Sequence, residues 1–473
     1  MKILLIKPDW VVRGASPPLG LLYLSAIAKR QFPGIETRLL DMRVVKDGAA
    51  RYDRLLRDWK PDIIGFSTLH GDLEFVAALA GHARRVLPGV HICCGGPYAT
   101  HAPGDFERIQ AVDSLVLGEG ENAFCHLVEQ VANGRAEPQT GFAPRRGGRF
   151  MLPEANDVID DLDALPFPDW DLLDFDLYAR LTQMNSFLAG RRYMLLFTSR
   201  ACPYHCSYCH SIFGKKFRMR SPESVVREME LLRSNYGVDE FQIVDDIFNF
   251  DRERVLKICR LIGERGLDIK MSFPNGLRGD RLDEEVILAL KRAGAYSITI
   301  AFETASPRLQ KLLRKNIDLE RAAEAVRISV RNGLITRGFF MLGFPTETRA
   351  ELQSTVRLAF SLPLHTASFF EVLPFKGTPL YDLAEQDIGP EKMALLKDQD
   401  YVAPSTYYML STGYNVRRLQ RLCYLRLWMN PVRIMRLFKL MPRKMLWLSR
   451  IPAALQEVLN YRRRKGSAPQ FPE

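Results

Sequence analysis

The stretch TSRACPYHCSYCHS (198–211) contains a compact group of three cysteines: Cys202, Cys206 and Cys209. A structural zinc site usually takes four protein ligands as two pairs, whereas these thiols stand four and then three residues apart on one short segment. Three thiolates can hold a four-iron cluster and leave one iron open for another ligand. A zinc ion with three cysteines and His205 or His210 is the alternative.

The cysteine segment stands near the start of a long series in which strand-like runs alternate with helical periodicity. Six strand-like runs belong to this series: 194–200, 240–246, 268–273, 295–304, 335–345 and 367–375. Six such units predict an open, partial (β/α)6 version of the parallel barrel, with functional residues on the loops that leave the strands. The cysteines follow the first of these strands.

The first 135 residues form a separate α/β series. Its five strand-like runs are 2–7, 36–42, 62–69, 90–97 and 112–120. Their alternation with helices predicts a Rossmann-like, flavodoxin-type sheet, in which a ligand lies at the carboxyl ends of the strands. From 136 to 192 the periodicity weakens and prolines accumulate, which indicates a linker. The predicted domains are therefore 1–135, a linker 136–192, a barrel 193–390 and a C-terminal region 391–473.

Length and composition indicate a folded protein of several domains. The chain has 473 residues, of which 47% are hydrophobic and 26% charged. Its first residues, MKILLIKPDWVVRG, become charged too early for a signal peptide, and no apolar run is long enough to span a membrane. We therefore expect a cytoplasmic protein. The remaining cysteines fit this expectation as buried free thiols: Cys93, Cys94, Cys125, Cys259 and Cys423.

Positive charge is concentrated in the C-terminal region. Between Asn415 and Lys465 there are fourteen Lys or Arg residues and one acid, so the rest of a chain of net charge +11 is slightly negative. The segment mixes these cations with Leu, Met and Trp, and prolines divide it into short amphipathic helices. These helices could pack on the barrel, lie peripherally on the inner membrane face through Trp428 and Trp447, or bind RNA. No dedicated RNA-binding fold is recognisable, so nucleic acid is not the partner we expect.

The pattern CxxxCxxC, with Tyr208 before the last cysteine, resembles the radical S-adenosylmethionine superfamily over roughly residues 192–390. The resemblance implies that Cys202, Cys206 and Cys209 hold a [4Fe-4S] cluster whose open iron binds S-adenosyl-L-methionine. An electron from a donor such as flavodoxin or ferredoxin would then yield methionine and a 5′-deoxyadenosyl radical. The resemblance also implies contacts with S-adenosylmethionine or substrate for five residues: Tyr208, Asp245, Asp246, Glu303 and Gly343.

Four motifs of the first domain adjoin predicted strand ends on one rim: PPLG (17–20), FST (66–68), GGPYAT (95–100) and GEGE (118–121). Directly ahead of such a barrel, they resemble the cobalamin-binding domain of the cobalamin-dependent branch of the superfamily. The resemblance implies the following cobalamin contacts: Gly20, Ser67, Thr68, Gly95, Gly96, Pro97, Gly118, Glu119 and Gly120. The motif DxHxxG is missing, which implies cobalamin held without a histidine ligand, with His70 as a rim residue. A nicotinamide site is not indicated, because GxGxxG is missing too.

The resemblance implies a C-methyltransferase, in which a substrate radical takes the methyl group from methylcobalamin. Some relatives use the same cofactors for ring closure or oxidation, so a radical cyclase or oxidase is one alternative and an RNA-modifying radical enzyme another. The basic, apolar tail favours an apolar or membrane-associated small molecule, such as a lipid or a tetrapyrrole, as substrate. No catalytic side chain can be assigned from the sequence.

Overall fold

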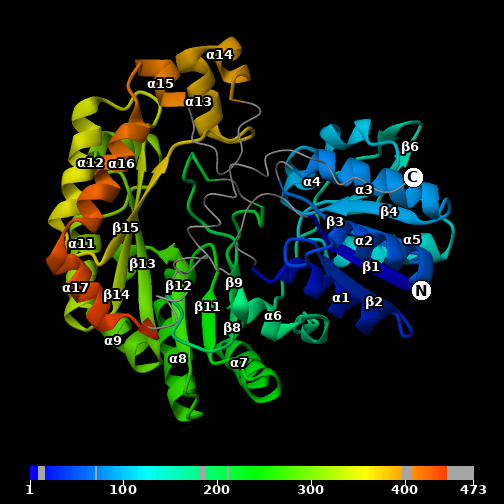
Figure 1. Ribbon diagram of the computed structural model, residues 1–473, viewed down its shortest axis with the longest axis horizontal. Coiled ribbons are helices and arrows are strands. Elements are labelled where there is room, and N and C mark those ends of the chain that lie inside the picture. The colour runs from blue at the N-terminus through cyan, green and yellow to red at the C-terminus, as the bar shows by residue number, and fades with distance from the viewer. Residues whose placement is uncertain are drawn as a thin grey trace. The chain divides into compact units, whose positions relative to one another are not determined.

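The structure of the chain is a computed structural model that describes residues 1–8, 16–69, 72–135, 137–181, 187–209, 212–396 and 407–444. These residues divide into two compact units, one up to residue 181 and the other from residue 187 to residue 444. Figure 1 labels most of the helices and strands of both units. Within the described ranges, no helix has both the length and the apolar character needed to cross a bilayer.

The first unit is built on a seven-stranded sheet in the order β2-β1-β3-β4-β5-β6-β7. Its strands are β1 (Lys2–Lys7), β2 (Glu36–Asp41), β3 (Ile63–Ser67), β4 (His91–Gly95), β5 (Ser114–Val116), β6 (Phe142–Arg146) and β7 (Arg149–Phe150). The pairs among β1 to β5 are parallel, and the order places the topological switch point between β1 and β3. The predicted flavodoxin-type sheet is confirmed.

Helices cover both faces of this sheet (Figure 1). They are α1 (Leu19–Gln31), α2 (Gly48–Arg54), α3 (Leu73–Val86), α4 (Pro97–His101) and α5 (Glu121–Ala132). Because successive strand residues point to opposite faces, Cys93 packs with α1 and α5 while Cys94 packs in the core that contains Tyr52 and α3 residues. Both thiols are buried and free, as their apolar surroundings predicted.

The segment from 137 to 181 packs against the first unit. Strand β6 pairs antiparallel with β5 and so extends the sheet that the preceding residues form. Asp157 accepts hydrogen bonds at the start of α5, from the Asn122 N–H at 2.7 Å and the Ala123 N–H at 3.1 Å. Asp169 accepts one from the Ser25 hydroxyl at 2.5 Å. The limits 136–192 of a linker stay a prediction; the regular elements described within them include β6, β7 and the short helix α6 (Phe175–Arg180).

The second unit is an open sheet of six parallel strands in the order β15-β14-β13-β12-β11-β8. Its strands are β8 (Tyr193–Leu196), β11 (Glu240–Ile243), β12 (Lys270–Leu277), β13 (Ala295–Glu303), β14 (Ile335–Leu342) and β15 (Thr366–Glu371). The connecting helices are α7 (Pro222–Tyr236), α8 (Arg252–Glu264), α9 (Glu284–Arg292), α10 (Pro307–Leu312), α11 (Leu319–Arg331) and α12 (Arg349–Ser361). The predicted partial barrel is confirmed.

The described part of the basic C-terminal region packs on the second unit. It follows α13 (Pro379–Ile388) and α14 (Pro390–Ala394) with α15 (Tyr407–Thr412), α16 (Val416–Trp428) and α17 (Pro431–Leu440). Helix α16 lies beside β15, the last strand of the sheet: the Phe369 N–H donates to the Tyr424 hydroxyl at 3.1 Å, and the Gln420 amide donates to the Phe369 carbonyl at 2.6 Å. Packing on the barrel, one of the three interpretations of the tail, therefore accounts for one face of α16.

Candidate functional site

The three cysteines lie on the loop between two short strands, β9 (Ser199–Arg200) and β10 (Arg218–Met219). Cys202 and Cys206 are half-buried, Cys209 is exposed, and none of the three takes part in a disulfide. Backbone contacts fix the loop through Ser207, whose N–H donates to Leu313 at 2.9 Å and whose carbonyl accepts from Leu380 at 3.0 Å. The loop is thus held to the segments that follow β13 and β15.

The thiols are close enough to influence one another's ionisation. Desolvation by neighbouring atoms raises the pKa of Cys209 to about 11, and the charges of Cys206 and Asp246 act in the same direction. The pKa of Cys202 is raised as well, chiefly by burial. Lys215 opposes both shifts. A metal cluster would supply the positive charge that three neighbouring thiolates require.

The donor set fits an iron–sulfur cluster. A four-iron cluster distributes its thiolates over separate irons, so its ligands need not converge on one point. Among the described residues, no three His, Cys, Asp or Glu side chains converge where a single ion could be bound. His205 is exposed, and His210, the other histidine of the zinc alternative, lies outside the described residues. The described residues therefore support iron–sulfur ligation by these cysteines better than a zinc site.

Tyr208 and Glu303, both predicted site residues, are brought together. The Tyr208 hydroxyl donates to the Glu303 carboxylate at 3.2 Å, and Lys315 donates to the same oxygen at 3.2 Å. Glu303 stands at the end of β13 with φ 64°, a left-handed conformation that costs about 1–2 kcal/mol for a residue with a side chain. Burial and the Glu303 charge raise the pKa of Tyr208. The cysteine loop is therefore linked to a strained strand end that presents a carboxylate.

Asp245 and Asp246 are adjacent in sequence but differ in their surroundings. Asp245 is buried, and its two oxygens accept from the Thr198 N–H at 2.6 Å, the Thr198 hydroxyl at 2.5 Å and the Ser199 hydroxyl at 2.6 Å. It positions the start of the cysteine loop. Asp246 is partly exposed, yet desolvation of its carboxylate and the charge of Asp245 raise its pKa to about 6. Its charge raises the pKa of Cys202 and Cys209, so Asp246 contributes to the electrostatics of the thiol loop.

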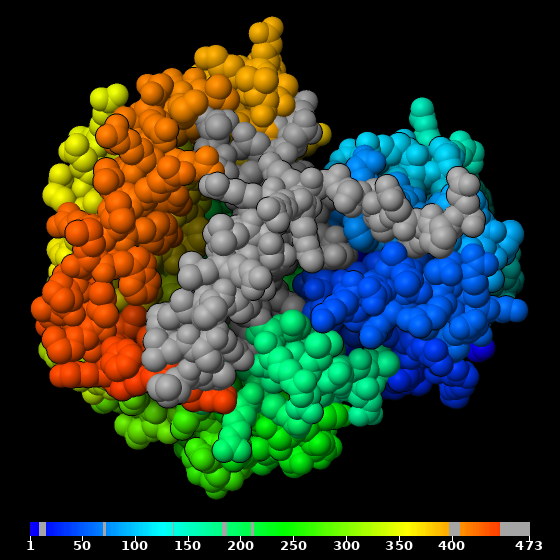
Figure 2. Space-filling view, viewed as in Figure 1, coloured from blue at the N-terminus to red at the C-terminus, as the bar shows by residue number. Residues whose placement is uncertain are grey.

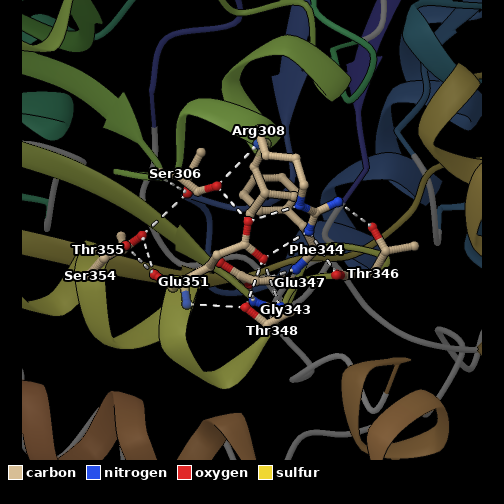
Figure 3. Close-up of polar contacts among 12 residues, drawn as sticks. Ser306, Arg308, Gly343, Phe344, Thr346, Glu347, Thr348, Glu351, Ser354 and Thr355 are labelled. Atoms are coloured by element: carbon tan, nitrogen blue, oxygen red, sulfur yellow. Dashed lines mark hydrogen bonds and ion pairs between the residues drawn. The ribbon is translucent and has the colours of Figure 1, made fainter.

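Gly343 lies in a tight turn after β14, with φ 90°. The Gly343 N–H donates to the Glu347 carboxylate at 2.6 Å and the Phe344 N–H donates to the same oxygen at 3.0 Å (Figure 3). A Cβ at Gly343 would lie 3.0 Å from Cβ of Tyr408, so Tyr408 approaches this backbone closely. A ligand contact for Gly343 stays a prediction. Its neighbour Phe344 packs on the Tyr208 ring, with centroids 6.2 Å apart, which connects the turn with the cysteine loop.

Sequence reasoning missed Glu347, although it stands four residues after Gly343 in the same motif, MLGFPTET. Its side chain is buried, and one carboxylate oxygen has no hydrogen-bond partner among the described residues. Burial raises the pKa of Glu347 to about 7, and the nearby Glu351 carboxylate adds to this shift. Glu351 differs because Arg308, at 2.8 Å, holds the pKa of that carboxyl at about 2 (Figure 3).

Glu347→Gln is expected to remove a pH dependence of folding stability. The folded-state pKa of about 7 exceeds the usual 4.5, so the folded chain binds more protons between these values and its stability falls as the pH rises through them. The free energy of unfolding, measured in urea, should therefore fall by roughly 2–3 kcal/mol more for wild type than for the variant between pH 5 and pH 8. Glu351→Gln is the matched control, since a carboxyl titrating near 2 changes little over this range. Parallel pH profiles for wild type and Glu347→Gln would contradict the expectation.

In the first unit, the ends of β3 and β4 meet at the predicted rim. The Thr68 hydroxyl donates to the Gly95 carbonyl at 2.7 Å, and the Tyr98 N–H donates to the Thr68 carbonyl at 3.2 Å. Gly96 has φ 90°, and a Cβ there would lie 3.0 Å from the Thr68 carbonyl oxygen and 3.4 Å from the Ser67 hydroxyl. Pro97 begins α4 immediately afterwards. The Gly96 backbone is thus packed closely against Thr68 at the carboxyl end of the sheet, the end where the ligands of such folds bind.

The remaining rim residues are less uniform. The Gly118 N–H donates to the Thr100 hydroxyl at 3.0 Å, but a Cβ at Gly118 would lie 2.7 Å from the Asp157 nitrogen, and the Glu119 N–H donates to the Asp157 carbonyl at 3.0 Å. Gly118 and Glu119 therefore contact the segment around Asp157. Gly120 precedes α5 with φ 98°. Gly20, at the start of α1, is exposed and has no atom within 4 Å of its Cβ position. His70 lies outside the described residues.

Sequence reasoning also missed Lys7, at the end of β1. Its ammonium group is buried and donates to the Ser67 carbonyl at 3.0 Å and to the Asp72 carboxylate at 3.3 Å. Burial lowers the pKa of Lys7 and raises the pKa of Asp72. Lys7 and Asp72 thus form an ion pair at the topological switch point, where Lys7 also holds the backbone of the rim residue Ser67. The sequence does not reveal this pair, because it depends on the pairing of β1 with β3.

Family models match both units. The radical SAM superfamily matches residues 196–359, and the B12 binding domain matches residues 10–128. The chain is 28% identical over 443 residues to an uncharacterized methyltransferase of Pyrococcus horikoshii, a match that covers 91% of this chain and 93% of the relative. It is 29% identical over 434 residues to the cytidylyl-2-hydroxyethylphosphonate methyltransferase of Streptomyces wedmorensis, covering 80% of each. An anaerobic magnesium-protoporphyrin IX monomethyl ester cyclase of Rubrivivax gelatinosus is 25% identical over 403 residues, covering 82% and 70%.

A solved structure shows the same fold. It is the radical S-adenosylmethionine methyltransferase TsrM from Kitasatospora setae, with a TM-score of 0.69 and 20% identity over 82% of this chain and 77% of that chain. A second structure of TsrM contains cobalamin and a [4Fe-4S] cluster, with a TM-score of 0.68.

Proposed function

The chain belongs to the cobalamin-dependent radical S-adenosylmethionine enzymes, and from this premise we propose that it methylates an unactivated carbon of a small molecule. The observation that carries the proposal is the group of three cysteines on one loop, which Tyr208 connects to the Glu303 carboxylate by a hydrogen bond. When bound, the cluster, S-adenosylmethionine and cobalamin would supply a 5′-deoxyadenosyl radical and a transferable methyl group, with electrons from a donor such as flavodoxin or ferredoxin.

The second unit's residues have distinct roles in this proposal. Cys202, Cys206 and Cys209 would hold the cluster, while Asp245 fixes the backbone at which their loop begins. Glu303 presents a buried carboxylate whose charge Lys315 balances, and such a group can accept hydrogen bonds from an amino group or a ribose hydroxyl. We assign Glu303 to S-adenosylmethionine binding on these grounds.

In the first unit we propose that the rim holds cobalamin without a histidine ligand to cobalt. Because Gly96 has no side chain, the ends of β3 and β4 pack closely together, and this brings the Ser67 hydroxyl to the carboxyl end of the sheet, where a ligand would bind. No histidine of the chain stands in a DxHxxG motif. We propose an apolar or membrane-associated substrate, because relatives of this chain include cyclases named for a tetrapyrrole and because the C-terminal region is rich in apolar side chains.

A second candidate is a radical cyclase or oxidase with the same cofactors. The relative from Rubrivivax gelatinosus favours it, because that protein is a cyclase and the match covers 82% of this chain. Neither the thiol loop nor the rim distinguishes the two reactions, since both would use the same groups.

Transfer of an isotopic methyl group tests the proposal. The protein is reconstituted anaerobically with iron, sulfide and hydroxocobalamin, reduced, and given S-adenosylmethionine with a trideuterated methyl group and a metabolite extract of the source cells. Methylation predicts a product heavier by one trideuteromethyl group in place of hydrogen, detected by mass spectrometry. A product that forms without the label, and has lost hydrogen instead, would favour the cyclase or oxidase and contradict methylation.

A further inference from the structure

Helices α16 and α17 expose a run of large apolar side chains. Eight of them are between 41% and 76% exposed: Leu422, Leu425, Trp428, Met429, Val432, Ile434, Met435 and Phe438. Figure 2 shows both helices, in orange and red, at the surface of the visible face. Scattered exposed apolar residues are normal, but such a concentration on two consecutive helices marks an interaction surface. We call these eight side chains, with the cations between them, the α16–α17 face.

Both helices are nevertheless packed on the second unit. Their other sides already pack on the second unit, since Cys423, Leu427 and Leu437 are buried and Leu437 belongs to a cluster with Ile335. The helices begin at Asn415 and Asn430, whose side chains accept from the backbone N–H three residues later. The α16–α17 face is therefore what remains apolar after the helices have docked.

The same segment carries only positive charge. From Asn415 to Lys444 there is no acid, and there are nine cations: Arg417, Arg418, Arg421, Arg426, Arg433, Arg436, Lys439, Arg443 and Lys444. The ion pairs described for the second unit involve none of them. Arg426 and Arg433 lie over the Phe360 ring, at 4.3 and 5.4 Å from its centroid. These charges, on short helices with exposed Trp and Phe, form a surface complementary to a negatively charged, partly apolar partner.

We propose that the α16–α17 face binds the surface of an anionic phospholipid bilayer, with the apolar side chains inserted at the headgroup boundary and the cations on the lipid phosphates. Both components match what an interfacial amphipathic helix uses. A second copy of the chain would bring nine further positive charges against the first set, which opposes association. RNA would use the cations but would leave Met429, Ile434 and Met435 without a role. The proposal rests on this surface and is independent of the reaction.

Vesicle sedimentation with the full-length, cofactor-loaded protein tests it. The probes are phosphatidylcholine vesicles with and without phosphatidylglycerol, and binding is expected only to the anionic vesicles, weakening as salt rises. Trp428→Ser combined with Phe438→Ser should weaken binding by about ten-fold or more, as should Arg421→Glu combined with Lys439→Glu. The matched controls, Leu395→Ser and Arg260→Glu, change exposed residues of the same unit and should bind like wild type.

Several outcomes would overturn the proposal. They are equal binding to neutral vesicles, no binding to anionic ones, or unchanged binding by both double variants. Sedimentation equilibrium that shows a wild-type dimer dissociated by the Trp428 and Phe438 changes would instead make the face an interface between copies. If wild type did not bind vesicles but shifted RNA in a gel, and the charge-reversed variant did not, the α16–α17 face would be an RNA-binding surface. None of these substitutions lies in the thiol loop, so we expect every variant to cleave S-adenosylmethionine like wild type. A failure of the membrane proposal can therefore be distinguished from a failure of the proposed reaction.

Discussion

Replacing any one of Cys202, Cys206 and Cys209 by alanine will leave the reconstituted protein without its iron–sulfur cluster and without cleavage of S-adenosylmethionine. The three thiols lie on one loop outside any disulfide, and among the described residues no histidine or carboxylate joins them to make a site that could tolerate a lost ligand. Iron and sulfide analysis, the visible absorption of the brown protein, and chromatographic measurement of 5′-deoxyadenosine check this. Wild type should contain about four irons per chain.

Cys259→Ala is the matched control for these variants. Cys259 is a free thiol in the same unit, but it is buried in α8 and burial raises its pKa to about 12, so it has no route to the loop. This variant should retain full iron content and 5′-deoxyadenosine formation. If Cys206→Ala kept both as well, or if wild type bound zinc in preference to iron, the assignment of the second unit would be wrong.

Gly96→Val should abolish retention of cobalamin while cleavage of S-adenosylmethionine continues. The new side chain would displace Thr68 and Ser67 at the ends of β3 and β4, because a Cβ there would already lie 3.0 Å from the Thr68 carbonyl and 3.4 Å from the Ser67 hydroxyl. The protein is incubated with hydroxocobalamin, desalted, and assayed for corrin by absorbance. Wild type is expected to retain about one corrin per chain and the variant none, so labelled methyl transfer should cease with the corrin.

The strain of the substitution needs its own control, because Gly96 has φ 90° and any side chain there costs about 1–2 kcal/mol. Gly34→Val provides it: Gly34 has φ 86° and no atom within 4 Å of its Cβ position, and it lies in the turn between α1 and β2, away from the carboxyl ends of the strands. Both variants should lose stability in thermal unfolding through this backbone strain, and Gly96→Val should lose more because its side chain also meets Thr68, but only Gly96→Val should lose corrin. If the two variants retained equal amounts of corrin, the proposal that the rim of the first unit binds cobalamin would be wrong.

The strands and the thiol loop could be predicted from local pattern because their signals are local. Strands such as β1, β3 and β8 are short, largely apolar runs, and buried parallel strands need such runs. Ser221 and Pro222 mark the start of α7 in sequence, and the structure shows the Ser221 hydroxyl accepting from the Ser224 N–H at 3.2 Å. The spacing of the cysteines is likewise visible without any tertiary information.

What escaped prediction depends on contacts between distant residues. Asp245 and Asp246 look equivalent in sequence, and only the hydrogen bonds from Thr198 and Ser199 show that the first of them is saturated. Lys315 follows Glu303 by twelve residues, yet the turn of chain through α10 returns it to that carboxylate. Strand β6, with the sequence FAPRR, lacks a strand pattern and is formed because β5 offers it an edge.

The contact between α16 and β15 has a practical consequence for handling this protein. An edge strand of a sheet has backbone N–H and C=O groups that no neighbouring strand pairs. In β15 the N–H and carbonyl of Phe369 form hydrogen bonds with the side chains of Tyr424 and Gln420 instead. A truncation that removes the apolar, basic C-terminal region would also remove α16 and leave the edge of β15 exposed to other chains. We expect the shortened protein to aggregate through the exposed edge of β15.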